Sequence, residues 1–271
     1  VPMLADVTLA LEQLYPALEA LAPPRRRAAW LRDALAERVQ LYQQKAAVST
    51  ESVNPYRSGT ELMKRLGRET LLVNDGALIL TRMFGVLRFA HPGSYLDTYP
   101  LGSMGMGTPM AIGAAILEQD LAAAEGRTPR RVVLVTGDGA FGFYPGELAT
   151  AVMEDLPLTV VIANNSSWGN ELATQPGTIG RLLNAGLGDI DYASIGRGFG
   201  VTSNVVETNE ELPAALDAAL ATHGPSLLDV RVTELSLEAR ELTILYSDVE
   251  QTRADHFSSK ATAPSLPTIN A

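Results

Sequence analysis

Two short polar segments carry the chemistry that this sequence could perform. Gly137-Asp138-Gly139-Ala140 follows the apolar run 132–136, and 24 residues separate Gly139 from Asn164-Asn165, which stands at the end of the apolar run 158–163. Glycines let the backbone turn sharply and approach a phosphate group closely. The carboxylate of Asp138 would repel that phosphate unless a cation stood between them. Charge balance therefore implies a bound metal ion at this segment.

The composition of the chain favours oxygen ligands for such a metal. Cysteine is absent, and none of the three histidines lies within a helical turn of another, so we expect neither a thiolate or iron–sulfur site nor a histidine zinc site. Mg²⁺ prefers near-octahedral oxygen ligation that includes phosphate oxygens. Asp138, Asn165 and one loop carbonyl would supply the protein's share of that ligation.

The elements around these segments predict an α/β fold with a parallel sheet flanked by helices on both faces. Strands are expected near 70–73, 132–136, 158–163, 202–205 and 226–232, and helices near 60–66, after Gly76, and at 110–124, 145–154, 192–199 and 209–222. Strands that alternate with helices of this length favour a parallel sheet. Ligands of such sheets bind beyond the carboxyl ends of the strands. Both polar segments are expected there.

The two ends of the chain do not show this alternation of strands and helices. Residues 6–21 and 25–47 predict two helices, which are followed by the polar linker 49–58. The sequence after Glu234 predicts a helical stretch and then a polar tail. We therefore expect N-terminal helices and a linker at 1–57, the sheet domain at 58–235, and a C-terminal arm or lid at 236–271.

Composition and charge exclude several classes of function. With 46% hydrophobic and 19% charged residues, the 271-residue chain can bury one large core. The net charge of -10 disfavours a nucleic-acid partner. No apolar run approaches the roughly 18 residues of a membrane helix, and residues 1–6 do not resemble a signal peptide. We expect no membrane partner and a cytoplasmic location.

The spacing of the two polar segments resembles the thiamine-diphosphate fingerprint of the acetolactate synthase and pyruvate decarboxylase superfamily. This resemblance implies the thiamine-diphosphate-binding fold, with thiamine diphosphate and Mg²⁺ as cofactors. By position it implies three metal ligands, which are Asp138, the side chain of Asn165 and the backbone oxygen of Ser167. The residues implied to bind the cofactor around them are Gly137, Asp138, Gly139, Ala140, Asn165, Gly169 and Asn170.

A second block, residues 99–109, resembles the loop with which the same superfamily grips the aminopyrimidine ring. The resemblance places Met104 where a bulky aliphatic residue holds the cofactor bent, and it makes the carbonyl of Gly102 an acceptor for the 4'-amino group. The block lies about 33 residues before Gly137, in the family's order.

Two further segments each leave two interpretations open. Asp75-Gly76-Ala77 stands at a strand end where relatives contact the diphosphate from the other side, or it is an ordinary turn. Glu171 lies six residues after Asn165, where pyruvate decarboxylases place an acid that acts on intermediates, so it is the candidate catalytic residue. It could equally be a solvated glutamate at the start of a helix.

The resemblance also implies a partner. In this superfamily a glutamate from a separate pyrimidine-binding domain drives the cofactor's amino–imino shift, and we find no such domain in this sequence. Residues 1–21 resemble the end of the family's middle domain, and a start at Val1 fits loss of an initiator methionine, a split gene or a fragment. We expect a hetero-oligomer with a second subunit that carries the pyrimidine-binding domain and its catalytic glutamate.

The expected reaction is cleavage or formation of a carbon–carbon bond next to a carbonyl. The first candidate is a lyase or decarboxylase that acts on a 2-hydroxyacyl-CoA or a 2-oxo acid. It is favoured because the extended tail resembles the C-terminal arms of 2-hydroxyacyl-CoA lyases and oxalyl-CoA decarboxylases. The tail could equally be an oligomer contact. The alternative is acyl transfer of the acetolactate synthase or sulfoacetaldehyde acetyltransferase type, although residues 172–175 replace the Met-x-Gln-Trp pattern of biosynthetic acetolactate synthases. A 2-oxoacid:ferredoxin oxidoreductase subunit would bring cysteines. A non-catalytic subunit would not need the metal ligand set.

Overall fold

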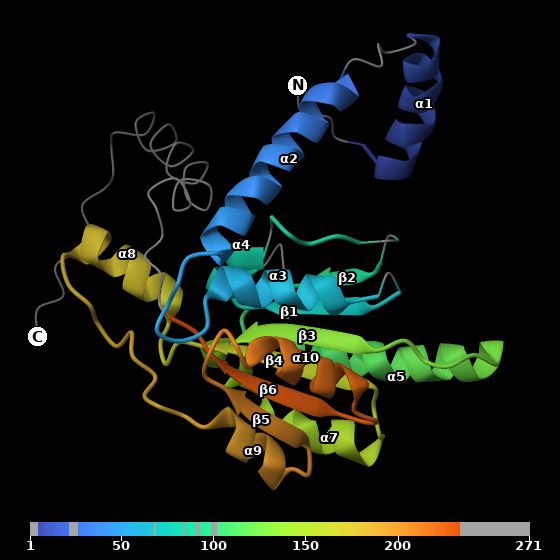
Figure 1. Cartoon of the computed structure of the whole chain (residues 1–271). Helices are drawn as coiled ribbons and strands as arrows, with labels where there is room; N and C mark the ends of the chain where they lie inside the picture. Colours follow the sequence, from blue (N-terminus) through green and yellow to red (C-terminus); the bar gives the residue numbers. More distant parts are fainter. Residues whose placement is uncertain are drawn as a thin grey trace, which may run out of the picture.

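Six parallel strands form one sheet in the order β2-β1-β3-β4-β6-β5 (Figure 1). The structure, a computed structural model, describes residues 5–21, 27–67, 69–83, 85–89, 91, 93–98 and 102–233, with only the course of the helix at 27–30. The strands are β1 (Leu71–Asp75), β2 (Tyr95–Asp97), β3 (Val132–Gly137), β4 (Leu158–Asn164), β5 (Thr202–Val206) and β6 (Ser226–Arg231). The predicted parallel sheet is confirmed.

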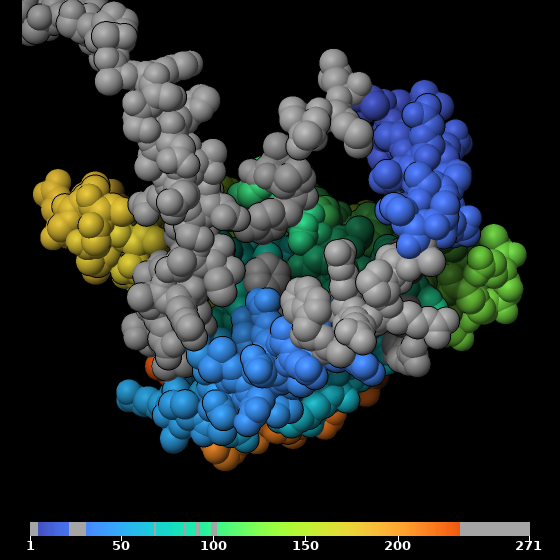
Figure 2. All heavy atoms as spheres, turned by 90° about the horizontal axis from the view of Figure 1, so that it is seen from above, coloured from blue at the N-terminus to red at the C-terminus, as the bar shows by residue number. Residues whose placement is uncertain are grey.

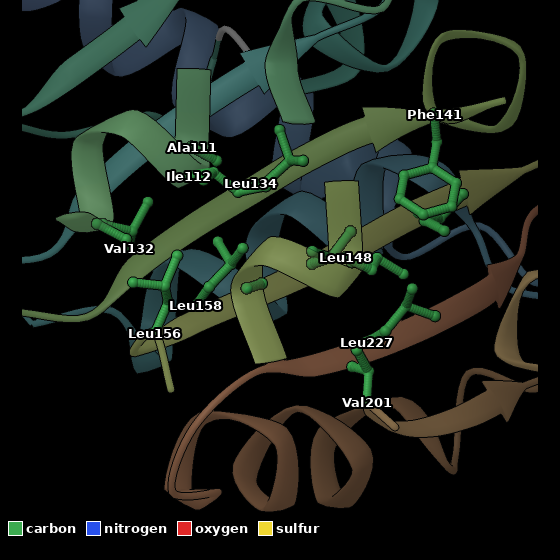
Figure 3. Packing of buried hydrophobic residues seen from close by; sticks show 14 of the residues in the cluster. Ala111, Ile112, Val132, Leu134, Phe141, Leu148, Leu156, Leu158, Val201 and Leu227 are labelled. Carbon is green, nitrogen blue, oxygen red and sulfur yellow. The ribbon is translucent and has the colours of Figure 1, made fainter. Parts of the chain in front are cut away.

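Helices cover both faces of the sheet, as predicted. One face carries α5 (Gly107–Glu125), α6 (Asp138–Phe141), α7 (Leu148–Met153) and α9 (Tyr192–Gly198), with the short 3-10 helix η1 (Pro145–Glu147) before α7. The opposite face carries α3 (Pro55–Arg65), α4 (Ala77–Met83) and α10 (Leu212–Ala221). Figure 3 shows Leu134, Phe141, Leu148 and Leu227 packed in the first of these layers. Both faces of β3 and β4 are buried, which explains why these strands are continuous apolar runs.

Three helices stand outside the two layers. α1 (Val7–Ala20) and α2 (Arg27–Ala46) precede the sheet, and α8 (Gly169–Ile179) follows β4. In the space-filling view α8, in yellow, and α1, in blue, lie at opposite edges of the molecule (Figure 2). The C-terminal end of α2 is anchored, because the Tyr42 hydroxyl donates to the Thr81 carbonyl at 2.8 Å and its ring meets that of Tyr56 edge-on.

Several helices begin a few residues from the predicted position, and for two of them the contacts give the reason. α3 starts at Pro55 rather than near Thr60, because the Asn54 side chain accepts from the backbone N–H groups of Tyr56 and Arg57 and a proline occupies the first helical position. α10 starts at Leu212 rather than at Asn209. The Asn209 side chain accepts instead from the Asn54 backbone N–H at 3.0 Å.

Other expectations concern the limits of the domains. Val53 bridges to Val232 at the end of the sheet, so the folded unit includes residues before 58. The limits at 57 and 235 stay predictions. The C-terminal arm, 236–271, and residues 99–101 of the second block lie outside the described residues. Within the described part of the chain, no helix has the length and apolar character needed to cross a membrane.

Candidate functional site

A cavity of about 240 Å³ opens at the carboxyl ends of the central strands. Gly137 of β3 lies opposite Ala163 of β4, so the two polar segments leave the sheet side by side. Eleven predicted site residues line this cavity. These residues are Gly102, Met104, Gly137, Asp138, Gly139, Ala140, Asn165, Ser167, Gly169, Asn170 and Glu171.

Asp138 is the buried carboxylate of the cavity. It is 3% exposed, and its two oxygens accept from the backbone N–H groups of Gly139 at 2.9 Å and Ser167 at 3.2 Å. Burial raises its pKa to about 6, although these N–H groups oppose the shift. A nearby cation would reverse the cost of keeping this group ionised, so the pocket is electrostatically suited to a metal ion.

The Asn164–Ser167 loop turns tightly next to Asp138. The Asn164 side-chain oxygen accepts from the Ser166 N–H at 3.0 Å, and Ser166 adopts a left-handed φ of 56°. The Ser167 hydroxyl donates to the Asn165 carbonyl at 3.1 Å. This turn brings both predicted metal-binding residues of the loop to the cavity wall, where Asp138 already lies.

Glycines bring backbone close to the cavity. Gly76 has a φ of 94°, and a Cβ there would lie 3.1 Å from the backbone nitrogen of Gly137. A Cβ on Gly137 itself would meet nothing within 4 Å and would enter open space. Because Gly76 and Gly137 both line the cavity, their main chains are available to a ligand.

Two aromatic rings that belong to neither glycine motif pack the loops around the cavity together. A Cβ on Gly139 would lie 2.4 Å from the Trp168 ring, and a Cβ on Gly105 would lie 2.7 Å from Phe143. The Phe143 and Trp168 rings are themselves 6.1 Å apart. These contacts join the segments 102–106, 137–143 and 165–169. An aromatic residue close to each glycine motif was the signal available in the sequence.

The Asp75 carboxylate caps the start of α5 and does not line the cavity. The Met106 side chain makes no capping hydrogen bond, and the Asp75 carboxylate instead accepts from the Gly107 N–H at 2.7 Å. Burial raises the pKa of Asp75, against backbone hydrogen bonds from Gly107, Gly76 and Gly105. Of the predicted Asp75-Gly76-Ala77 contact, only Gly76 and Ala77 line the cavity.

Two further predicted residues are partly exposed to solvent. Met104 is 42% exposed, and Glu171 is partly buried in the first turn of α8. The cavity also includes residues that sequence reasoning missed, among them Leu78, Leu80 and Arg82 of α4. Within the described ranges no three His, Asp or Glu side chains converge. The predicted metal set, with one carboxylate, one amide and one backbone oxygen, would not produce such a cluster.

Comparisons with known proteins find a matching family and similar chains. Residues 79–230 match the family described as "Thiamine pyrophosphate enzyme, C-terminal TPP binding domain". Acetolactate synthase large subunit IlvG of Mycobacterium tuberculosis is 31% identical over 66% of this chain and 31% of its own length. Human 2-hydroxyacyl-CoA lyase 1 is 29% identical over 66% of this chain and 32% of its own length. The chain thus spans about a third of these relatives.

A solved structure has a similar fold. The benzoylformate decarboxylase of Polynucleobacter necessarius superposes with a TM-score of 0.61 and 26% identity, over 68% of this chain and 34% of that one.

Proposed function

We propose that this chain, which belongs to the thiamine pyrophosphate enzymes through their C-terminal TPP binding domain, holds the diphosphate of the cofactor together with Mg²⁺. The enzyme it serves is a lyase or decarboxylase that acts on a 2-hydroxyacyl-CoA or a 2-oxo acid. The observation that carries the proposal is that one cavity gathers every residue the cofactor fingerprint implies.

The residues present fit a diphosphate and a divalent cation. Asp138 is a buried carboxylate whose hydrogen-bond donors, among the described residues, are backbone N–H groups. The space next to Gly137 is open, and polar oxygens of Asn165 and Ser167 are close by. We assign Asp138, the Asn165 side chain and the Ser167 carbonyl to Mg²⁺. Backbone groups of Gly137, Gly139, Ala140, Gly169 and Asn170 bind the cofactor.

The protein's share of the chemistry is to bind, orient and manage protons. When bound, thiamine diphosphate supplies the carbon nucleophile that attacks a carbonyl. Met104 would support the bent form of the bound cofactor, and the Gly102 carbonyl would accept a hydrogen bond from its 4'-amino group. Glu171, at the cavity rim on α8, exchanges a proton with the reacting substrate.

The substrate class rests on the relatives. A 2-hydroxyacyl-CoA lyase and a benzoylformate decarboxylase are both similar to this chain, which supports the lyase or decarboxylase reaction. An acyl transfer of the acetolactate synthase type is the second candidate, supported by the 31% identity to that enzyme. A panel of CoA esters and 2-oxo acids offered to the assembled enzyme distinguishes the two.

We also propose a partner subunit that contributes the pyrimidine-binding domain and its glutamate. Apolar side chains beside the cavity support this, since Met104, Met106, Phe143 and Tyr144 are each 42–53% exposed. A surface of this kind commonly marks a protein interface.

The test uses the chain alone and with the chain that co-purifies with it. We expect Mg²⁺-dependent cofactor binding and turnover only in the complex. Robust turnover by the isolated chain would refute the partner, and a complex that binds no thiamine diphosphate would refute the function.

A further inference from the structure

A second buried carboxylate, Asp229 of β6, lies behind the candidate metal site rather than in it. It is 0% exposed, and it interrupts the apolar strand Leu227-Leu228-Asp229-Val230. A fully buried acidic residue is costly unless it is hydrogen-bonded. The hydrogen-bond partners of Asp229 therefore indicate its structural role.

One oxygen of Asp229 holds the Asn164–Ser167 loop. Asp229 Oδ1 accepts from Asn164 Nδ2 at 2.9 Å. The opposite end of the same amide, Asn164 Oδ1, accepts from the Ser166 N–H at 3.0 Å. Asp229 thus fixes which way the Asn164 amide faces, and the amide in turn fixes the turn that leads to Ser167.

The other oxygen of Asp229 holds the Asp138 side. Asp229 Oδ2 accepts from the Tyr192 backbone N–H at 3.0 Å. The Tyr192 hydroxyl donates to the Asp138 carbonyl at 3.0 Å, and its ring meets Phe141 edge-on.

A cation balances this carboxylate from the protein surface. Arg231 Nη2 lies 3.2 Å from Asp229 Oδ2, and its Nη1 pairs with Asp189 at 2.6 Å. Arg231 also donates to the Ile190 carbonyl at 3.1 Å, and the same carbonyl accepts from Asn164 Nδ2. The segment before α9 is thereby tied to the same group.

We propose that Asp229 is a positioning residue that sets the distance and orientation between the two halves of the metal site, Asp138 on one side and Asn165 with Ser167 on the other. It does so through Asn164 and Tyr192 and does not touch the cavity. This inference rests on the proposed function for its metal, but its geometric part does not. Without Asp229, Asn164 Nδ2 keeps only the Ile190 carbonyl as an acceptor, so the amide that accepts from the Ser166 N–H is held less firmly.

The experiment compares Asp229→Asn with a matched control, Glu118→Gln. Glu118 is also a buried carboxylate, 1% exposed, but it is held by Arg127 and Arg130 near the C-terminal end of α5 and does not line the cavity. An asparagine at 229 offers one acceptor where two N–H donors point, so its amide group opposes the other donor. Both variants lose stability for similar reasons, and only Asp229→Asn should loosen the site.

Two readouts separate positioning from general destabilisation. In the full chain without metal, amide hydrogen exchange at Ser166 and Ser167 should accelerate at least tenfold in Asp229→Asn and should stay unchanged in Glu118→Gln. In the assembled enzyme, the affinity for Mn²⁺ in the presence of thiamine diphosphate should fall at least tenfold for the first variant alone. Tyr192→Phe should lower Mn²⁺ affinity with less loss of stability.

The outcomes distinguish this inference from the proposed function. Unchanged exchange at Ser166 and Ser167 in Asp229→Asn, or equal acceleration in both variants, overturns the positioning role. If Asp229→Asn does not fold, Tyr192→Phe and the exchange measurement on it decide the matter. Faster exchange together with a wild-type enzyme that binds no Mn²⁺ supports the positioning of the loop and refutes the metal.

Discussion

Replacing Asp138 with Asn should stabilise the metal-free chain at pH 8 while it abolishes Mg²⁺ binding. Burial raises the pKa of Asp138 from its ordinary value of 3.8 to about 6 in the folded chain. The folded state therefore holds this proton more tightly than the unfolded state. The stability that Asp138 contributes is complete below pH 3.8 and is lost as the pH rises through about 6.

The size of the effect follows from the same values. The pKa values of Asp138 in the unfolded and folded chain differ by about two units. At pH 8, where the folded chain must keep the carboxylate ionised, this difference lowers the free energy of unfolding by about 3 kcal/mol. An asparagine avoids this cost. The asparagine side chain can accept a hydrogen bond from only one of the two N–H groups that face Asp138. The lost hydrogen bond reduces the gain in stability by about 1 kcal/mol. We expect a net gain of about 2 kcal/mol at pH 8 and none near pH 4.

Urea unfolding of the full chain in EDTA, at pH 4 and pH 8, measures this difference. Asp217→Asn is the control, because Asp217 is an exposed carboxylate that pairs with Arg65 and should give no gain. An Asp138→Asn variant that is less stable than the wild type at pH 8, or a gain that is the same at both pH values, would refute the reasoning. So would normal Mg²⁺ affinity of this variant in the complex.

Substitutions at three further positions test the site. Gly139→Ala should weaken thiamine diphosphate binding at least tenfold in a cofactor titration, because its Cβ would lie 2.4 Å from the Trp168 ring; the idea fails if the affinity is unaffected. Ser166→Gly should keep or raise the melting temperature and Ser166→Val should lower stability by about 1–2 kcal/mol, because φ is 56°; the reverse order would contradict a left-handed Ser166. Glu171→Gln should reduce turnover in steady-state kinetics with little change in cofactor affinity, and an unchanged rate would leave Glu171 as a solvated side chain.

Much of the fold was predictable because apolar runs and glycine turns are local signals. The runs at 132–136 and 158–163 predicted β3 and β4 to within one residue, since both faces of these strands are buried. β2 was missed because three residues with partly exposed side chains leave no apolar run. The start of α3 was missed because Asn54 and Pro55 form a helix start within what resembled a polar linker.

The cavity residues that lie in short motifs directly after a strand could be predicted from the sequence. The contacts between residues on different strands and loops, far apart in the sequence, could not. Asp138 and Asn165 were identified because each directly follows a strand in a recognisable motif. The contacts of Asp75 with Gly107 and of Asp229 with Asn164 join residues 32 and 65 positions apart, and no local pattern encodes them. A carboxylate within an apolar strand was the one available sign of Asp229.

The central claim is that Asp138, Asn165 and the Ser167 carbonyl hold the metal that binds the cofactor's diphosphate. Crystals of the assembled enzyme with thiamine diphosphate and Mn²⁺, measured for anomalous scattering, test it directly. We expect one strong Mn²⁺ peak bonded to these three groups and to diphosphate oxygens. A peak bound elsewhere, or an ordered cofactor whose diphosphate lies away from Asp138, would contradict it.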